Sequence, residues 1–273
     1  MSKINLSKNF PLLACNDFEN LRANLKLSDI EHYTAFDFKQ KITQRLNTLT
    51  FNEIIGLDLF PHKDLITGCN HFIDNVIMQY GLKNIQIFEH DYSYYKRIRP
   101  NITYTTLETL DPNKPLLMAA PFPGHLGLHR QFKQIIKRCE EIGTKVYLDG
   151  AWFPPSFGIL LDLTSPCIES IAFSCSKAYD LGDNRIGIRY SKHKKTTDSI
   201  TQLNDRNMIS RLSYQIACKF LDNFAYDHIV SLYKEDYDKV VKDLKLRPSN
   251  MVHAVFSIDW KNLYGIKDVL PKK

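Results

Sequence analysis

Short apolar segments alternate with longer segments of helical periodicity along the middle of the chain, and this alternation limits the folds open to it. The apolar segments are residues 85–88, 116–120, 145–148, 170–174 and 186–190. Between the second and the third, residues 129–142 repeat apolar side chains at helical spacing until Gly143 ends the pattern. Strands that alternate with helices build a mainly parallel sheet with helices on both faces. We therefore predict an α/β protein with three layers: helices, a central sheet and helices.

The 273 residues suffice for one large domain or for one domain with a small appendage. We predict three parts: an N-terminal helical segment (1–63), a large ligand-binding domain (64–225) and a reduced C-terminal subdomain (226–273). The clearest helix of the first part is residues 36–49, and the large domain opens with a helix at 71–80. A long helical stretch runs from about residue 198 to residue 232, and one apolar run follows at 251–258.

Charge and composition exclude several classes of protein. The net charge is +6, but basic and acidic residues are interspersed except at 192–195, which predicts a solvated loop and not a nucleic-acid surface. No apolar run reaches the roughly 18 residues that cross a membrane, and the first residues lack a signal-peptide core. The six cysteines form no C-x-x-C pair and no zinc-like group with histidine. We predict a cytoplasmic protein with reduced cysteines and no metal, nucleic-acid or membrane partner.

Polar side chains stand where two of the predicted strands end. Asp149 closes one strand, and Ser174, Ser176 and Lys177 close another, with Arg185 just before the next. In such sheets, ligands bind beyond the carboxyl ends of the strands. A lysine can form a Schiff base with an aldehyde, hydroxyls and a guanidinium can hold a phosphate, and a carboxylate can keep a pyridine nitrogen protonated. The set predicts a site for a cofactor that carries an aldehyde and a phosphate.

These residues resemble two motifs of the fold type I pyridoxal-phosphate enzymes, and within them of the aspartate aminotransferase branch. The segment from Ser174 to Gly187 is similar to S-x-S-K-x-[FY]-G-x-x-x-x-R-[VI]-G, with Arg185 eight positions after Lys177. The segment from Tyr147 to Trp152 is similar to the strand that ends in D-x-A-Y, and its Asp149 precedes the lysine by 28 positions. Two motifs in the family's order carry the resemblance.

The resemblance implies pyridoxal 5′-phosphate as the cofactor and a role for each matched residue. Lys177 and Asp149 would be catalytic: Lys177 would carry the cofactor as a Schiff base, and Asp149 would pair with the ring nitrogen. Ser174, Ser176 and Arg185 would bind the phosphate.

Further matches extend the implied cofactor site upstream. Thr67, Gly68 and Cys69 resemble a Ser-Gly-Thr turn that holds the phosphate at a helix N-terminus. Tyr92 stands where an aromatic residue stacks on the pyridine ring, with Tyr94 as the alternative, and Trp152 occupies the place of a tyrosine that contacts the ring oxygen.

The sequence also departs from the family pattern. Phe122 to His125 replaces N-P-T-G, whose Asn contacts the ring oxygen, and His125 is one candidate for that role. Trp152 can only donate a hydrogen bond, through its indole N–H. Few residues follow residue 225, so the late arginine that clamps a substrate carboxylate in this branch has no obvious counterpart, and Arg247 is a weak candidate.

The implied function is that of an aminotransferase-like enzyme, which acts on an amino acid or a related amine through Lys177. Two alternatives stay open. The first is another reaction with the same cofactor, such as decarboxylation, elimination or racemisation. The second is a binding or regulatory protein without turnover. The family builds its sites at a subunit interface, so the resemblance also implies a homodimer with a shared active site.

Overall fold

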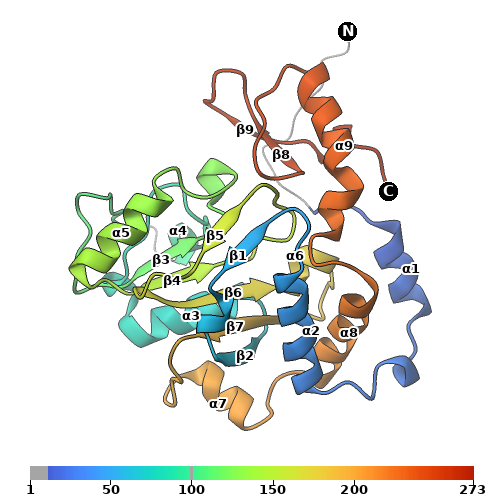
Figure 1. Ribbon diagram of the computed structural model, residues 1–273, viewed down its shortest axis with the longest axis horizontal. Coiled ribbons are helices and arrows are strands. Elements are labelled where there is room, and N and C mark those ends of the chain that lie inside the picture. The colour runs from blue at the N-terminus through green and yellow to red at the C-terminus, as the bar shows by residue number, and fades with distance from the viewer. Residues whose placement is uncertain (1–11, 99–100) are drawn as a thin grey trace.

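A mixed five-stranded sheet forms the centre of the protein in a computed structural model that describes residues 12–98 and 101–273 (Figure 1). Its strand order is β2, β7, β6, β4, β3, with bounds His62–Ile66, Gly187–Ser191, Ile168–Ser174, Val146–Asp149 and Leu116–Ala119. The strands predicted near residues 116–120, 145–148, 170–174 and 186–190 are thereby confirmed.

Strand β7 runs against the other four strands of this sheet. It pairs antiparallel with both β2 and β6, whereas β4 pairs parallel with β3 and β6. Strands β2, β3, β4 and β6 run in the same direction, as expected for a mainly parallel sheet, and β7 is the exception. The chain between β6 and β7 contains the five-residue helix α6 (Cys175–Tyr179) and a turn, and not the long crossover helix that usually joins parallel neighbours.

One predicted strand needs correction, and several strands were not predicted. The segment 85–88 forms isolated parallel bridges, Gln86 to Leu116 and Phe88 to Thr105, beside β3 and is not a regular strand. Strand β2 falls partly in the segment predicted as helical, as does β1 (Glu53–Ile55), which pairs parallel with β5 (Leu160–Asp162). Polar residues interrupt the apolar pattern of β2, whereas β1 and β5 are only three residues long.

Helices cover both faces of the sheet, as predicted. Side chains alternate along the strands: Leu117 and Tyr147 face one hydrophobic cluster, and Met118 and Leu148 face the other. The first cluster receives α3 (Cys69–Tyr80) and one residue of α7 (Ser199–Asp205), and the second receives α2 (Ala35–Asn47), α5 (Phe132–Ile142) and α8 (Arg211–Asn223). The fold is therefore the predicted three-layer arrangement.

The end of the chain forms a small unit beside the sheet, at the upper right of Figure 1. Helix α9 (His228–Asp243) is followed by the antiparallel pair β8 (Ala254–Phe256) and β9 (Leu263–Gly265), with α1 (Asn16–Asn24) below it. The long helix predicted from residue 198 is in fact α7, α8 and α9, which are separated by turns. A further short α-helix is α4 (Tyr94–Ile98).

One hydrophobic cluster includes residues of all three predicted parts, for example Phe38, Leu148 and Tyr237, so the division into three stays a prediction. Within the described residues, no helix combines the length and apolar character needed to cross a membrane.

Candidate active site

The carboxyl ends of β3, β4 and β6 meet at one edge of the sheet and open into a cavity of about 250 Å³. The register places Ala119 opposite Asp149, and Asp149 opposite Ala172, two residues before Ser174. Eight of the ten predicted site residues line the cavity: Cys69, Tyr92, Asp149, Trp152, Ser174, Ser176, Lys177 and Arg185. Of the other two, Thr67 accepts a hydrogen bond from Arg185 at the rim, and Gly68 follows it in the chain.

Lys177 lies on α6, a single helical turn that starts directly at the end of β6. The Ser174 hydroxyl caps this turn by accepting a hydrogen bond from the backbone N–H of Ser176, at 3.2 Å. Burial lowers the pKa of Lys177, and the Arg185 cation lowers it further, while Asp180 and Asp149 act in the opposite direction. The position therefore holds an amine that loses its proton more readily than an exposed lysine.

Asp149 is almost fully buried at the end of β4. Its Oδ1 accepts a hydrogen bond from the backbone N–H of Ala151 at 2.9 Å, and the Cys69 thiol also donates to the carboxylate. Burial raises the pKa of Asp149, whereas these two hydrogen bonds and the Lys177 cation lower it. A cationic ligand atom beside Asp149 would favour its ionised form.

The turn before α3 and the guanidinium of Arg185 form an anion-binding corner. Arg185 Nε donates to the carbonyl oxygen of Thr67 at 3.4 Å. Gly68 has φ +108°, and a Cβ there would lie 3.0 Å from Arg185 Nη2, so a side chain at this position would enter the corner. The N-terminus of α3 begins at Cys69 and supplies backbone N–H groups. Among the described side chains, the Ser176 hydroxyl is buried without a hydrogen-bond partner.

The structure distinguishes among several aromatic and basic candidates. Tyr92 lines the cavity, whereas Tyr94 OH donates to Asp74 at 2.7 Å. His125 is not among the lining residues, and its Nδ1 accepts a hydrogen bond from the backbone N–H of Arg130. Arg247 lies near Trp260, donates to the carbonyl oxygen of Ile258 and is not among the residues that line the cavity.

Asp91 and His253 lie beside the cavity and were not predicted as site residues. Asp91 accepts hydrogen bonds from the backbone N–H groups of Tyr92 (2.6 Å) and Ala119 (3.2 Å), and burial raises its pKa to about 7, with Asp149 adding to the shift. His253 stacks on Trp152 with ring centroids 4.8 Å apart. Asp91 follows the apolar segment 85–88 and could have been found as a polar residue at a strand end, whereas His253 stands in an apolar run and carries no such signal.

No protein-family model matches the chain, and no curated protein matches its sequence. Many solved structures resemble it in three dimensions. A putative aminotransferase from Silicibacter pomeroyi has a TM-score of 0.65 at 14% identity over 92% of this chain and 74% of the other. An aspartate aminotransferase from Thermotoga maritima has a TM-score of 0.60 at 14% identity, over 91% of this chain and 75% of the other. An L-threonine-O-3-phosphate decarboxylase from Porphyromonas gingivalis has a TM-score of 0.58 at 14% identity, over 88% of this chain and 81% of the other. The chain thus has the aminotransferase fold that the motifs predicted.

Proposed function

We propose that this chain, which has the fold of the fold type I aminotransferases, binds pyridoxal 5′-phosphate on Lys177 and catalyses a reaction at the Cα of an amino compound. The observation that carries the proposal is the convergence of Lys177, Asp149 and Arg185 on one cavity from two separate segments of the chain, the end of β4 and the connection between β6 and β7. Lys177 can bind the aldehyde of this cofactor, Asp149 can pair with its ring nitrogen, and Arg185 can bind its phosphate.

The residues of the cavity fit the cofactor at its phosphate end as well. The unpartnered Ser176 hydroxyl needs a hydrogen-bond partner, because a buried polar group without one is costly. The corner formed by Gly68, the N-terminus of α3 and Arg185 suits a phosphate dianion. Ser174, Ser176, Arg185 and the turn of Thr67 to Cys69 would hold the phosphate, and Tyr92 and Trp152 would contact the ring.

When bound, the cofactor supplies a pyridine ring that accepts the charge developing at the substrate Cα. Asp149 would hold the proton on the ring nitrogen through a charge-assisted hydrogen bond. The Lys177 amine, once released by the substrate amine, would move the proton to and from Cα as general base and acid. Its lowered pKa increases the fraction of neutral amine at neutral pH.

Amino-group transfer is the reaction that we propose first, because aminotransferases predominate among the similar structures described above. A decarboxylase stands among the same structures, so decarboxylation, elimination and racemisation are the second candidate. The intact set of Asp149, Lys177 and Arg185 disfavours a protein without turnover.

We also propose a homodimer in which the partner completes the site. Arg185 and Thr67 are exposed at the cavity rim in a single chain, where a second copy could cover them. Sedimentation at several concentrations tests the dimer, and a monomer that is fully active contradicts a shared site.

Reductive trapping tests the cofactor assignment. After addition of pyridoxal 5′-phosphate and borohydride, peptide mapping should place the pyridoxyl group on Lys177. Lys195 is the matched control, because burial lowers its pKa to about 8 but its amine donates to Tyr147 OH outside the cavity. Lys177→Ala should abolish the label and the cofactor absorbance band, and Lys195→Ala should keep both. Labelling that persists in Lys177→Ala would contradict the proposal.

A further inference from the structure

Trp152 contacts two residues that are distant in the sequence, Lys177 and His253. The Nζ of Lys177 lies 4.3 Å from the centroid of the indole ring, within cation–π distance. The ring of His253 stacks on the indole with an interplanar angle of 20°. The three side chains form a contiguous group in which the tryptophan contacts both the lysine amine and a residue of the C-terminal segment.

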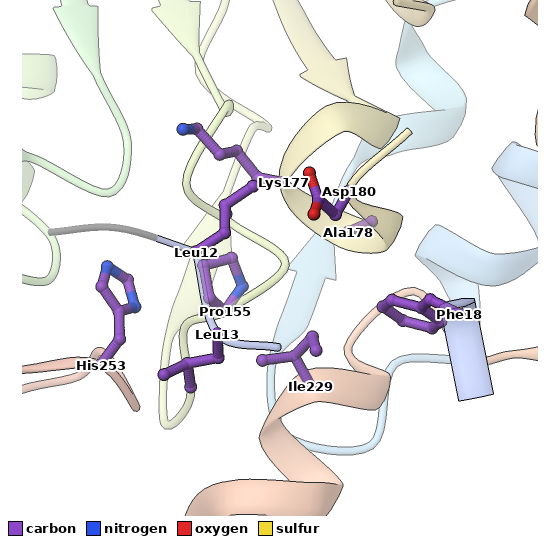
Figure 2. A pocket seen from close by; sticks show the side chains of 9 residues that line it. All are labelled: Leu12, Leu13, Phe18, Pro155, Lys177, Ala178, Asp180, Ile229 and His253. Atoms are coloured by element: carbon purple, nitrogen blue, oxygen red, sulfur yellow. The ribbon is translucent and has the colours of Figure 1, made fainter. Parts of the chain in front are cut away.

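His253 brings the C-terminal unit to the reacting lysine. It is 3% exposed, and its backbone carbonyl accepts a hydrogen bond from the N–H of Ile266, near β9. Figure 2 shows His253 and Lys177 on the walls of a small second cavity, together with Leu12, Leu13 and Pro155. Burial and the nearby Lys177 cation lower the pKa of His253 to about 3, so the imidazole is neutral at physiological pH.

The indole face favours the charged form of the amine. A cation over a tryptophan ring is stabilised by about 0.5–2 kcal/mol, whereas a neutral amine gains much less. Burial of Lys177 acts in the opposite direction by lowering its pKa. A neutral imidazole fixes the indole without adding a second cation that would repel the ammonium.

We propose that Trp152, held in plane by His253, is a positioning residue that keeps the Lys177 amine over the indole while the lysine is not covalently engaged. This inference rests on the proposed role of Lys177 as the reacting amine. It gives the C-terminal unit a function at the site, because the histidine that orients the tryptophan comes from that unit. The Lys177 ammonium that forms after proton removal from the substrate would then be stabilised at a fixed place.

Other ionisable groups also face Lys177 and must stay constant in the test. Arg185 lowers the pKa of the lysine, while Asp180, Asp149 and Cys69 raise it. Replacing Trp152 by a smaller residue would change the burial of the amine along with the ring. Fluorinated tryptophans avoid this problem, because they weaken the negative face of the ring and nearly preserve its shape.

The chain allows a clean experiment because it contains only two tryptophans, Trp152 and the half-exposed Trp260. In a Trp260→Phe background, biosynthetic incorporation of mono-, di- and trifluorotryptophan changes Trp152 alone. The Lys177 pKa is measured in the ligand-free full chain by NMR after reductive ¹³C-methylation, with Lys177→Arg to assign the signal. We expect the pKa to fall stepwise with fluorination, by about 0.4–1.5 units for full loss of the cation–π contact. A pKa that is independent of fluorination overturns the proposal.

Two variants of His253 test the second half of the inference. His253→Phe retains a neutral planar ring. This variant should keep both the stepwise fall of the Lys177 pKa with fluorination and the ¹⁹F signal of Trp152. His253→Ala should broaden or shift that signal. It should also reduce the change in the Lys177 pKa across the fluorinated tryptophans at least twofold. An unchanged series in His253→Ala overturns the positioning role of His253. Because neither measurement uses the cofactor, failure here is separate from failure of the reductive trapping above.

Discussion

The thiol of Cys69 donates a hydrogen bond to the carboxylate of Asp149 and so connects the first residue of α3 with the last residue of β4. Burial raises the pKa of both groups, which keeps the thiol protonated and makes it the donor. The bond itself lowers the pKa of Asp149. The turn proposed to hold the phosphate and the residue proposed to meet the ring nitrogen are therefore coupled.

Removal of the Cys69 thiol should raise the pKa of Asp149. A hydrogen bond to a charged group contributes about 1.5–3 kcal/mol, which corresponds to about 1–2 pKa units. In Cys69→Ala, the acid limb of the kcat profile should move to higher pH by this amount, and in Cys69→Ser it should move much less because the hydroxyl still donates. Cys139→Ala, which removes a buried thiol from α5, is the control. An acid limb that stays in place would disprove the coupling.

Asp149→Ala should retain part of the cofactor affinity and lose turnover by at least about a hundredfold, the scale of one preorganised electrostatic contact. The carboxylate stabilises the transition state more than the ground state, because charge reaches the ring only during the reaction. Asp180→Asn is a matched control: Asp180 also lines the cavity, and asparagine tolerates its φ of 47°. Single-turnover rates measure the effect, and a near-normal rate would refute this role of Asp149.

Arg185→Leu should weaken binding of the cofactor by about 10- to 100-fold, as expected for loss of a charged hydrogen bond. Its guanidinium sits beside Gly68 and Thr67, at the proposed phosphate end. Arg247→Leu should have little effect, because Arg247 lies outside the cavity. Titration followed by absorbance gives the affinity. If Arg185→Leu changes substrate selectivity more than cofactor binding, the phosphate assignment is wrong.

Asp91 should make the folded protein less stable as the pH rises. Its pKa is raised from 3.8 to about 7 in the folded state, so between about pH 4 and 7 the folded chain binds more protons than the unfolded chain. Stability therefore falls through this window, by at most about 1.4 kcal/mol per pH unit from this group, and changes no further above it. Asp91→Asn should remove that slope in urea unfolding measured from pH 4 to 8. If the mutant keeps the wild-type slope, the pH dependence of the free energy of unfolding comes from other groups.

Much of the sheet and of the site followed from the sequence because both depend on local patterns. Strands β4 and β6 are short apolar segments, and their ends carry Asp149 and Ser174 directly into the cavity. A lysine one turn beyond a strand end has little freedom in where it points. The positions of these side chains are consequently determined within a few residues of chain.

Strand β2 and His253 could not be predicted, because distant contacts decide them. In β2, the carboxylate of Asp64 pairs with the buried guanidinium of Arg189 in β7, with Oδ2 and Nη2 2.6 Å apart. This ion pair allows a charged residue in the strand, and for that reason the apolar pattern did not predict it. His253 reaches Trp152 across about a hundred residues of sequence, through the packing of the C-terminal unit. No spacing in the sequence encodes either contact.

The described lining of the cavity offers few cationic side chains, and this predicts the substrate range. Among the described residues that line the cavity, the cationic side chains are Lys177 and Arg185, and both have proposed roles toward the cofactor. An α-carboxylate would then lack the bidentate arginine contact that supplies both charge and geometry. If the proposed function holds, the protein should accept simple amines nearly as well as the corresponding amino acids, unless a basic residue of a partner subunit contributes.

Half-reaction kinetics with aspartate, glutamate and their decarboxylated amines measure this selectivity directly. We expect kcat/KM ratios between acid and amine within about tenfold, because a full charged contact would give about 10- to 100-fold or more. The same ratios measured on a dilute monomeric sample separate this chain's contribution from that of a partner. Rapid, saturable conversion by aspartate alone would contradict the prediction, and no conversion by any amine would favour a protein without turnover.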